Sequence, residues 1–501
     1  MRPQRVFAAT CAALACALAL ALAPRARGDA APFPWLHHPK PSGSPSATPL
    51  PTPTPTPRLI VHGAGDALPA DDGAGRNTLF GFLASITKNV RTQFCETDAE
   101  TALVAFAGDT TPCEPIIAAS PAPPAPSAPP LDFVAADVPL TATSYAAIAA
   151  AHHGTPVQIP YVAAGVAIVY DNPDVRGPLA FSVLTLCKIA SGEITDWSAI
   201  PRDPANPSGL AFPPRPLRFV YRADPSGETF ALANFLSAVD ARGRRRTCVR
   251  DGMTFGLSDR FVPDATHAGM LPSPLPRGAT RAVFLGAASA ADEIACVLGS
   301  PAACRGAVVR GRAAQATPRA GTVGYALAAG TAAPMHYPAG IARLRIVREG
   351  IARDEDPVAD LPGVATKLTR YATNAVLAPP VPNRRPPEDL VPLPPVASHT
   401  TAAAVPCLAV IPPAAYADPA VGYPIVAITN LLFHATGNGE ATDALQTLAG
   451  LTNESKNFTY KRIRTIDPDG ASTGTTGYSV LPLSTQKKTG LPNLIAHCIG
   501  R

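Results

Sequence analysis

The sequence predicts an α/β protein, and two observations lead to this fold class. Strand-like and helix-like segments alternate along the chain, and 47% of the 501 residues are hydrophobic against 16% charged. This is enough apolar material for one large or two medium globular domains. The 59 prolines and 38 glycines exceed the share of an ordinary globular chain but stay below that of low-complexity sequences. Proline-rich stretches must therefore alternate with folded ones.

The N-terminal residues 1–30 are typical of a secretory signal peptide. Arginines precede an apolar run over 6–23, and Pro24 ends it. An uncleaved membrane anchor is the alternative, because this run is just long enough to span a bilayer. Its alanine-rich composition favours cleavage, after Ala23 or Ala30. We therefore expect a periplasmic or secreted protein.

Three proline-rich stretches punctuate the mature chain. Residues 31–57 predict a semi-extended spacer, since Pro, Ser and Thr bury little apolar surface. The clusters 115–130 and 377–398 predict surface loops within the fold.

Eight cysteines remain after the signal peptide, and an even number in an exported chain favours disulfides. Isolated buried thiols are the alternative. The chain has no C-x-x-C motif and no histidines at zinc spacing near its cysteines, so we expect no metal site and no cofactor. The mature cysteines are Cys95, Cys113, Cys187, Cys248, Cys296, Cys304, Cys407 and Cys498.

Hydrophobic periodicity predicts the individual elements. Apolar, often β-branched residues indicate strands, and the i, i+3, i+4, i+7 spacing of Leu232, Phe235, Leu236 and Val239 indicates a helix that begins near Ser226. The other predicted helices are 182–190 and 441–451. The predicted strands are 59–61, 159–170, 217–221 and 424–433, with a further strand ending just before Asp137.

The junction over 221–230, where a strand runs into a polar turn and a helix, is the most informative segment. A helix N-terminus presents unpaired N–H groups, Gly227 allows close backbone approach, and the Arg222 guanidinium offers a planar fork to an anion. The alternative is an ordinary helix cap at Ser226 with an Arg222–Asp224 surface pair. A glycine-rich loop over 63–69 is weaker evidence for a second such junction.

The charge balance excludes one class of partner. The formal net charge is +5, and residues 1–30 supply +3 of it through four arginines and one aspartate. Nucleic acids and anionic membranes are bound by clustered basic faces, which a nearly neutral chain is not expected to present.

Taken in order, several stretches resemble the periplasmic phosphate-binding proteins of ABC importers (PstS-like) and, more closely, their DING relatives. The resemblance spans most of residues 58–501, and no single motif carries it. The matching stretches are 63–69, 131–140, 159–167, 186–197, 221–230, 321–325, 422–426 and 498–501.

This resemblance implies a two-lobed type II periplasmic-binding-protein fold, with an anion held between lobes that are joined by two crossing hinge strands. Lobe I would comprise 58–160 and 326–501, and lobe II would comprise 161–325. The ligand groups that carry over are the N–H of Leu68, the carboxylate of Asp137, the guanidinium of Arg222, the hydroxyl of Ser226 and the N–H of Gly227. A carboxylate at Asp137 would select an oxyanion that still carries a proton, hydrogen phosphate over sulfate.

The resemblance also implies a Cys187–Cys248 disulfide. Proximity along the chain adds three further expected pairs. These are Cys95–Cys113, Cys296–Cys304 and Cys407–Cys498.

The chain departs from the family pattern most clearly at Glu228, where the family has threonine. A hydroxyl is also missing at Ala67 and Ala136, and no equivalent serine stands in 97–101. Glu228 either faces water and complements the helix dipole, or lies at the anion site and neutralises Arg222. In the second case phosphate binding is weakened, or a different ligand binds.

We therefore expect an exported, monomeric solute-binding protein for phosphate or a related oxyanion, which feeds an ABC permease and is not an enzyme. The alternative is a DING-like secreted or surface protein with a non-transport role or a phosphatase-associated activity. No paired nucleophile and histidine base is evident in the sequence, which argues against the enzyme.

Overall fold

The computed structural model describes a large part of the chain, and all of this part belongs to the compact unit Thr56–Arg501. The expected signal peptide and the spacer 31–57 lie outside the described residues, as does nearly all of the cluster 115–130. The described residues are 59–66, 90–108, 130–150, 154–175, 179–190, 192–202, 206, 212–242, 284–306, 308–309, 312–313, 321–328, 340–348, 351–357, 359–378, 390–398, 403–450, 478–481 and 494–500.

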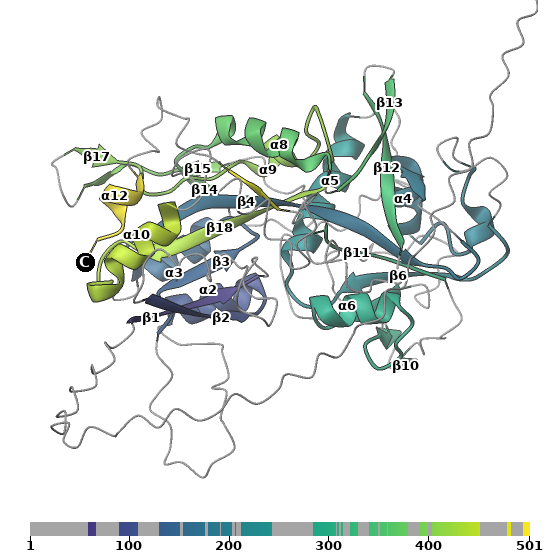
Figure 1. Cartoon of the computed structure of the whole chain (residues 1–501), viewed down its shortest axis with the longest axis horizontal. Helices are drawn as coiled ribbons and strands as arrows, with labels where there is room; N and C mark the ends of the chain where they lie inside the picture. The colour runs from purple at the N-terminus through teal and green to yellow at the C-terminus, as the bar shows by residue number, and fades with distance from the viewer. Residues whose placement is uncertain are drawn as a thin grey trace, which may run out of the picture. The chain divides into compact units, whose positions relative to one another are not determined.

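A mixed sheet forms the centre of this unit, with the strand order β2-β1-β3-β18-β4-β11-β6-β7-β8 (Figure 1). Strands β5, β12, β13 and β19 attach beside this path. The bounds are β1 Leu59–Gly65, β2 Val90–Glu96, β3 Phe133–Ala136, β4 Pro156–Asp171, β5 Ala180–Ser182, β6 Leu217–Arg222, β7 Phe284–Ala287, β8 Arg305–Gly306, β11 Gly321–Leu327, β12 Gly340–Arg348, β13 Ile351–Glu355, β18 Val426–His434 and β19 Tyr478–Val480.

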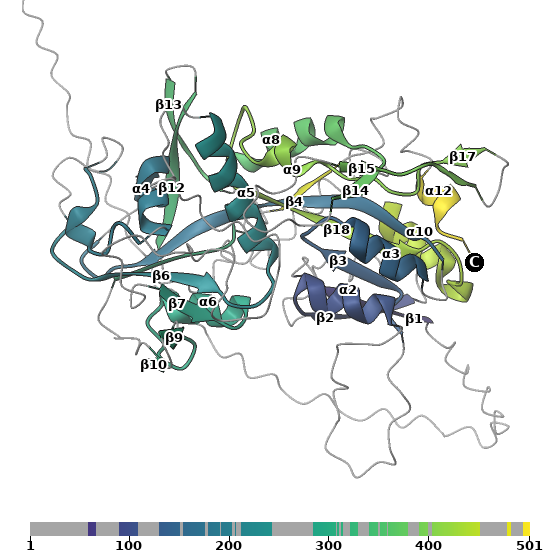
Figure 2. The ribbon, with the colours of Figure 1, turned by 180° about the vertical axis from the view of Figure 1, so that it is seen from behind.

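Helices cover the sheet, and short strand pairs form separate two-stranded sheets. In Figures 1 and 2, α2 and α3 lie on one face of β1 and β3, and α10 lies on the other. The helices are α2 Ala99–Ala107, α3 Ala142–Ala150, α4 Val183–Ala190, α5 Gly227–Arg242, α6 Ala290–Val297, α8 Leu361–Leu368, α9 Pro413–Tyr416, α10 Thr442–Gly450 and α12 Leu494–Cys498. The short pairs are β9 Val308–Val309 with β10 Arg312–Ala313, β14 Ala375–Leu377 with β15 Leu390–Pro392, and β16 Val396–Ala397 with β17 Ala404–Val405.

The strand directions bring two carboxyl ends toward each other. Strand β3 is parallel to β1, β6 is parallel to β7 and β11, and the antiparallel strands β18 and β4 lie between these groups. Ala136, the end of β3, is level with Pro160 of β4 through Asn430. Strand β6 lies parallel to β11 and therefore runs in the opposite direction to β3 and β4. Leu327, the end of β11, is level with Val166 of β4. Both β3 and β6 therefore end beside the middle of β4.

Two large hydrophobic clusters share β4. Residues between Val157 and Ala163 contribute to a cluster with α2, α8, α10 and β18. Beyond them, Ala164, Val166, Ile168 and Tyr170 contribute to a cluster with α4, α5 and β6. A third, smaller cluster packs α6 against β6, β7 and β11. The lobe boundaries expected at 160/161 and 325/326 remain a prediction.

The α/β class and the strongly periodic elements are confirmed. The predicted strand 159–170 is β4 and is buried almost throughout, and the strand 217–221 is β6. The helix predicted near Ser226 is α5, which begins at Gly227. The predictions for 182–190, 424–433 and 441–451 correspond to α4, β18 and α10.

Two expectations were wrong in part. Gly63 and Gly65 belong to β1 rather than to a loop. Glycine is needed at these two strand positions because a side chain would collide with Phe133 or Ala135 of the neighbouring strand β3. The cluster 377–398 contains the paired strand β15, whose Leu390 and Val391 pack partly buried against the core. Prolines at strand ends and edges are compatible with such short strands.

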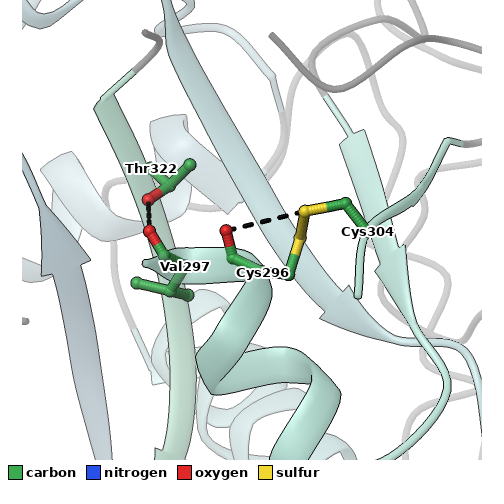
Figure 3. The surroundings of a disulfide bond; sticks show 4 residues. All are labelled: Cys296, Val297, Cys304 and Thr322. Atoms are coloured by element: carbon green, nitrogen blue, oxygen red, sulfur yellow. Dashed lines mark hydrogen bonds between the residues drawn. A yellow bond between two sulfur atoms is a disulfide. The ribbon is translucent and has the colours of Figure 1, made fainter. Parts of the chain in front are cut away.

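Two expected disulfides are present. Cys407 is bonded to Cys498, and Cys296 at the end of α6 is bonded to Cys304 (Figure 3). Beside the latter, the Thr322 hydroxyl of β11 donates to the Val297 carbonyl (Figure 3). Cys95 and Cys187 are also disulfide-bonded. Their expected partners, Cys113 and Cys248, lie outside the described residues, so these two pairings remain predictions.

Within the described part of the chain, no helix has the length and apolar character needed to cross a bilayer.

Candidate functional site

The converging ends of β3 and β6 bring predicted site residues together. Asp137 directly follows β3, Arg222 is the last residue of β6, and Gly227 begins α5. Asp137 and Arg222 are 1% and 6% exposed, so both charged side chains are buried. The carboxyl ends of strands are where open α/β sheets bind ligands.

Gly227 packs against Asp137 across this site. A Cβ added at Gly227 would lie 2.0 Å from the Cβ of Asp137, so the α5 N-terminus packs directly on the aspartate. Glycine is therefore required for this approach, as expected for a backbone that meets an anionic group closely. Residues 90 positions apart in the sequence share one site.

Ser226 caps α5 and also faces Glu228. Its hydroxyl oxygen accepts from the Thr229 N–H at 3.3 Å, and its carbonyl accepts from the Phe230 N–H at 3.1 Å. The hydroxyl itself donates to Oε2 of Glu228. The cap interpretation of Ser226 is therefore correct, and the same hydroxyl also lies within reach of the site's charged groups.

The Arg222 guanidinium is bound by two carboxylates. Its Nε donates to Oδ1 of Asp224 at 2.7 Å, its Nη2 donates to Oδ2 of the same residue, and its Nη1 donates to Oε2 of Glu228 at 3.2 Å. The Arg222–Asp224 pair of the alternative interpretation exists, but Arg222 is buried. Burial alone would lower the pKa of Arg222, yet Glu228 and Asp224 outweigh this and raise it above its ordinary value.

Glu228 is 5% exposed and lies inside the site. The interpretation in which it faces water is wrong. Its Oε2 accepts from both Arg222 and Ser226, two of the groups predicted to bind an oxyanion. The structure therefore agrees with the interpretation in which Glu228 neutralises Arg222.

Asp137 has one bonded and one unpartnered oxygen. Its Oδ1 accepts from the Thr429 hydroxyl of β18, whereas its buried Oδ2 has no hydrogen-bond partner. Burial raises its pKa to about 7, the nearby Glu228 adds to this, and the Thr429 hydrogen bond and Arg222 oppose it. The free oxygen is the kind of buried polar atom that a ligand would satisfy.

Asp66 is a site residue that the sequence analysis missed. It follows β1 as Asp137 follows the parallel neighbour β3, and its Oδ2 accepts from the Asp137 N–H at 2.8 Å. Burial raises its pKa well above the usual range, and the charges of Asp137 and Glu228 act in the same direction. Its position in the glycine-rich loop predicted to follow the strand 59–61 was a usable signal.

A second layer supports Arg222 from the side of α6 and β11. The Tyr325 hydroxyl accepts from the Arg222 N–H at 3.1 Å and shares a hydrogen bond with Thr229 at 2.7 Å. The Tyr325 N–H donates to Oε1 of Glu293 at 3.1 Å. Glu293 is fully buried, its Oε2 has no partner, and burial raises its pKa well above the usual range.

The electrostatic balance of the site is acidic. Asp66, Asp137, Glu228 and Glu293 all act on Arg222, in addition to its partner Asp224. Glu96, the last residue of β2, joins them, since burial and the charge of Glu228 raise its pKa. Burial raises the pKa of Asp66, Glu96, Asp137 and Glu293, and the charge of Arg222 opposes this rise only in part.

The structure therefore brings together Asp137, Arg222, Ser226, Gly227 and Glu228. Leu68, the sixth predicted residue, lies outside the described residues. In the described residues, no group of three or more His, Cys, Asp or Glu side chains has an arrangement that could hold a metal ion.

Comparison with known proteins identifies the family. A model described as a PBP superfamily domain matches residues 72–358, more than half of the chain. The chain belongs to the PBP superfamily.

Relatives of this PBP-superfamily chain include a phosphate-binding protein and a protein named as a phosphatase. A phosphate-binding protein from an unknown prokaryotic organism is 29% identical over 319 residues, which is 62% of this chain and 70% of that protein. Alkaline phosphatase L of Pseudomonas aeruginosa strain UCBPP-PA14 is 31% identical over 120 residues, 24% of this chain and 26% of that protein.

Among solved structures, the fold is similar to that of a high-affinity periplasmic phosphate-binding protein, PfluDING, determined with phosphate bound. The TM-score is 0.52 at 17% identity, and the match covers 88% of this chain and 99% of that one. The resemblance to DING and PstS-like proteins is thus confirmed, and with it the type II fold of this PBP-superfamily chain.

Proposed function

We propose that this chain is an exported binding protein for phosphate or a related tetrahedral oxyanion, and that it delivers this ligand to an ABC permease. The observation that carries the proposal is that Arg222 and Ser226 meet at the N-terminus of α5, where both bind Glu228, and that Gly227 of the same helix packs on Asp137. A guanidinium, a hydroxyl and helix N–H groups together match the oxygens of a tetrahedral anion.

Asp137 gives the proposed site its selectivity. An ionised carboxylate repels a fully ionised oxyanion but accepts a hydrogen bond from one that carries a proton. The unpartnered Oδ2 of Asp137 is the atom that would accept it. A phosphate that carries at least one proton would therefore bind in preference to sulfate when Asp137 is ionised.

The two hydrophobic clusters that share β4 support a division into two lobes. We place the lobes as the sequence predicts them, 58–160 with 326–501 and 161–325, and expect a monomer in solution. Export follows from the predicted signal peptide over 1–30, and the periplasm or the exterior is the expected location.

Isothermal titration of the purified protein with inorganic phosphate and with sulfate tests this function. We predict phosphate binding that weakens by about 10- to 100-fold in Arg222→Gln, because the variant loses charge-assisted hydrogen bonds to the anion. Arg215→Gln is the matched control, since Arg215 also pairs with an aspartate, donating from Nε and Nη2 to Oδ2 of Asp174, but at the surface.

Loss of the buried Arg222 leaves two carboxylates without their partner, so a thermal melt must show that the variant is folded. Ser226→Ala is the milder second variant and is expected to weaken binding less. Unchanged phosphate affinity in both folded variants would refute the site, and absence of any oxyanion binding by any form of the protein would favour the non-transport alternative.

One observation favours a phosphatase-associated activity as the second candidate. The Ser226 hydroxyl donates to the Glu228 carboxylate, so a nucleophile and a base lie in contact, which was not evident from sequence. Alkaline phosphatase L matches part of the chain. Turnover of a phosphate monoester above background, lost in Ser226→Ala, would support this candidate over simple binding.

A further inference from the structure

The groups offered to an oxyanion already hold an anion from the chain itself. Oε2 of Glu228 accepts from Nη1 of Arg222 at 3.2 Å and from the hydroxyl of Ser226, at the N-terminus of α5. The side chain is 5% exposed. A carboxylate presents negatively charged oxygens to these donors in the same way as one edge of a phosphate does.

We propose that Glu228 is an internal ligand of the oxyanion site: an external anion binds only after the Glu228 carboxylate gives up Arg222 and Ser226. This inference rests on the proposed function and adds its regulation. Glu228 thereby becomes the residue that sets how strongly, and for which charge state of the ligand, this site binds.

Charge makes the competition unavoidable. Arg222 carries one positive charge and is already paired with Asp224 through two hydrogen bonds. Glu228 accepts from Nη1 of the same guanidinium. A dianion that entered would therefore meet two carboxylates and a neutralised guanidinium. Like charges placed side by side in a desolvated site strongly disfavour binding.

A proton on the ligand relieves this repulsion, because a singly charged oxyanion is repelled less than a doubly charged one. The site surrounding Glu228 supplies little positive charge besides Arg222, because the ionisable groups that act on Glu228 from the other elements are acidic or phenolic. They are Asp66, Glu96, Asp137, Asp224, Glu293 and Tyr478.

The wild-type site is therefore selective for a monoanionic tetrahedral oxyanion, dihydrogen phosphate when phosphate is the ligand. Replacement of Glu228 by glutamine keeps the size and the acceptor oxygen but removes the charge. Such a variant would admit the dianion as well.

Isothermal titration with inorganic phosphate, at mildly acidic and mildly alkaline pH, tests the inference on the full mature chain. Glu228→Gln is expected to bind phosphate at least about tenfold tighter than wild type at alkaline pH, with a smaller gain at acidic pH. Glu228→Thr restores the hydroxyl of the family pattern and should show the same direction.

Asp443→Asn is the matched control. Asp443 is also the second residue of a helix, α10, but it is exposed and belongs to no part of the site. Its loss removes a helix-terminal charge without touching Arg222, so phosphate affinity should match that of wild type.

The outcomes separate the inference from the function on which it rests. Equal affinity, within about twofold, for wild type and both folded Glu228 variants overturns the internal ligand and leaves phosphate binding intact. Binding by the Glu228 variants alone supports the inference most strongly. Absence of binding in wild type and in both folded variants overturns the proposed function, and the inference falls with it.

Discussion

The contact between Gly227 and Asp137 is the residue-scale feature on which the site depends. Because an added Cβ would lie 2.0 Å from the Cβ of Asp137, Gly227→Ala forces the α5 N-terminus away from the aspartate. We expect a loss of about 1–3 kcal/mol in the free energy of unfolding, measured by chemical denaturation. Phosphate binding should weaken in the same variant.

A second substitution tests the cause of that loss. The double variant Gly227→Ala/Asp137→Gly removes the colliding side chain, so the alanine should destabilise the Asp137→Gly background by much less than the wild-type background. Equal destabilisation in the two backgrounds would show that the contact is not responsible.

Sequence reasoning found the local part of the site and missed the long-range part. Asp137, Arg222 and Ser226 lie in recognisable segments. Gly227 was expected to admit a ligand to the backbone, which stays a prediction, whereas its close approach to Asp137 was not foreseen. Thr429 contacts Asp137 across 292 residues, and Tyr325 contacts Arg222 across 103. Such contacts depend on strand order and register, which residue types at one position do not reveal.

At the scale of elements, hydrophobic periodicity predicted the helices and strands that are buried on one face or along their whole length. Strand β4 and helices α4 and α10 were found because their apolar residues repeat with the right spacing. Strand β1 was predicted too short, as 59–61, because glycines such as Gly63 and Gly65 usually indicate a loop. Their place in a strand is explained by close packing on the neighbouring strand β3. Short edge strands such as β15 lack a period that can be recognised.

The two described disulfides close chain segments of very different length. Cys407–Cys498 spans 91 residues and joins the segment that follows β17 to the end of α12. Cys296–Cys304 spans 8 residues. In the chain-entropy model the longer loop stabilises more, by about 2 kcal/mol. We predict that Cys407→Ser/Cys498→Ser lowers the denaturation midpoint more than Cys296→Ser/Cys304→Ser does.

Chemical denaturation of the two double variants under oxidising conditions measures this difference. A larger loss from the Cys296–Cys304 pair would show that its packing beside α6 matters more than loop length.

At the scale of the whole molecule, buried acids make stability depend on pH. Asp137 has its folded-state pKa raised to about 7, so the folded chain retains a proton that the unfolded chain loses near the ordinary value of 3.8. Between these values the free energy of unfolding decreases as the pH rises, and above about 7 the full penalty is present. Asp66 and Glu293 shift in the same direction.

Asp137→Asn should therefore raise the melting temperature at pH 8 and change it little at pH 4. The amide keeps the acceptor for Thr429 and cannot ionise, so the expected gain at pH 8 is about 1–4 kcal/mol, at roughly 1.4 kcal/mol for each pKa unit. Thermal melts across this pH range measure it. A parallel shift of the two pH profiles would contradict the assignment.

Strand β4 has a consequence for hybrid proteins. It spans 16 residues, and its apolar side chains leave the first large core for the second near Ala163 and Ala164. Consider a chimera in which everything after the middle of β4 comes from a relative. Its β18 would come from the relative and would have to pair with the first half of β4 from this chain, because β18 lies along β4 from Pro156 to Gly165. Exchange of the segment between β4 and β11 leaves that pairing within one parent, so crossovers placed there should give folded hybrids more often.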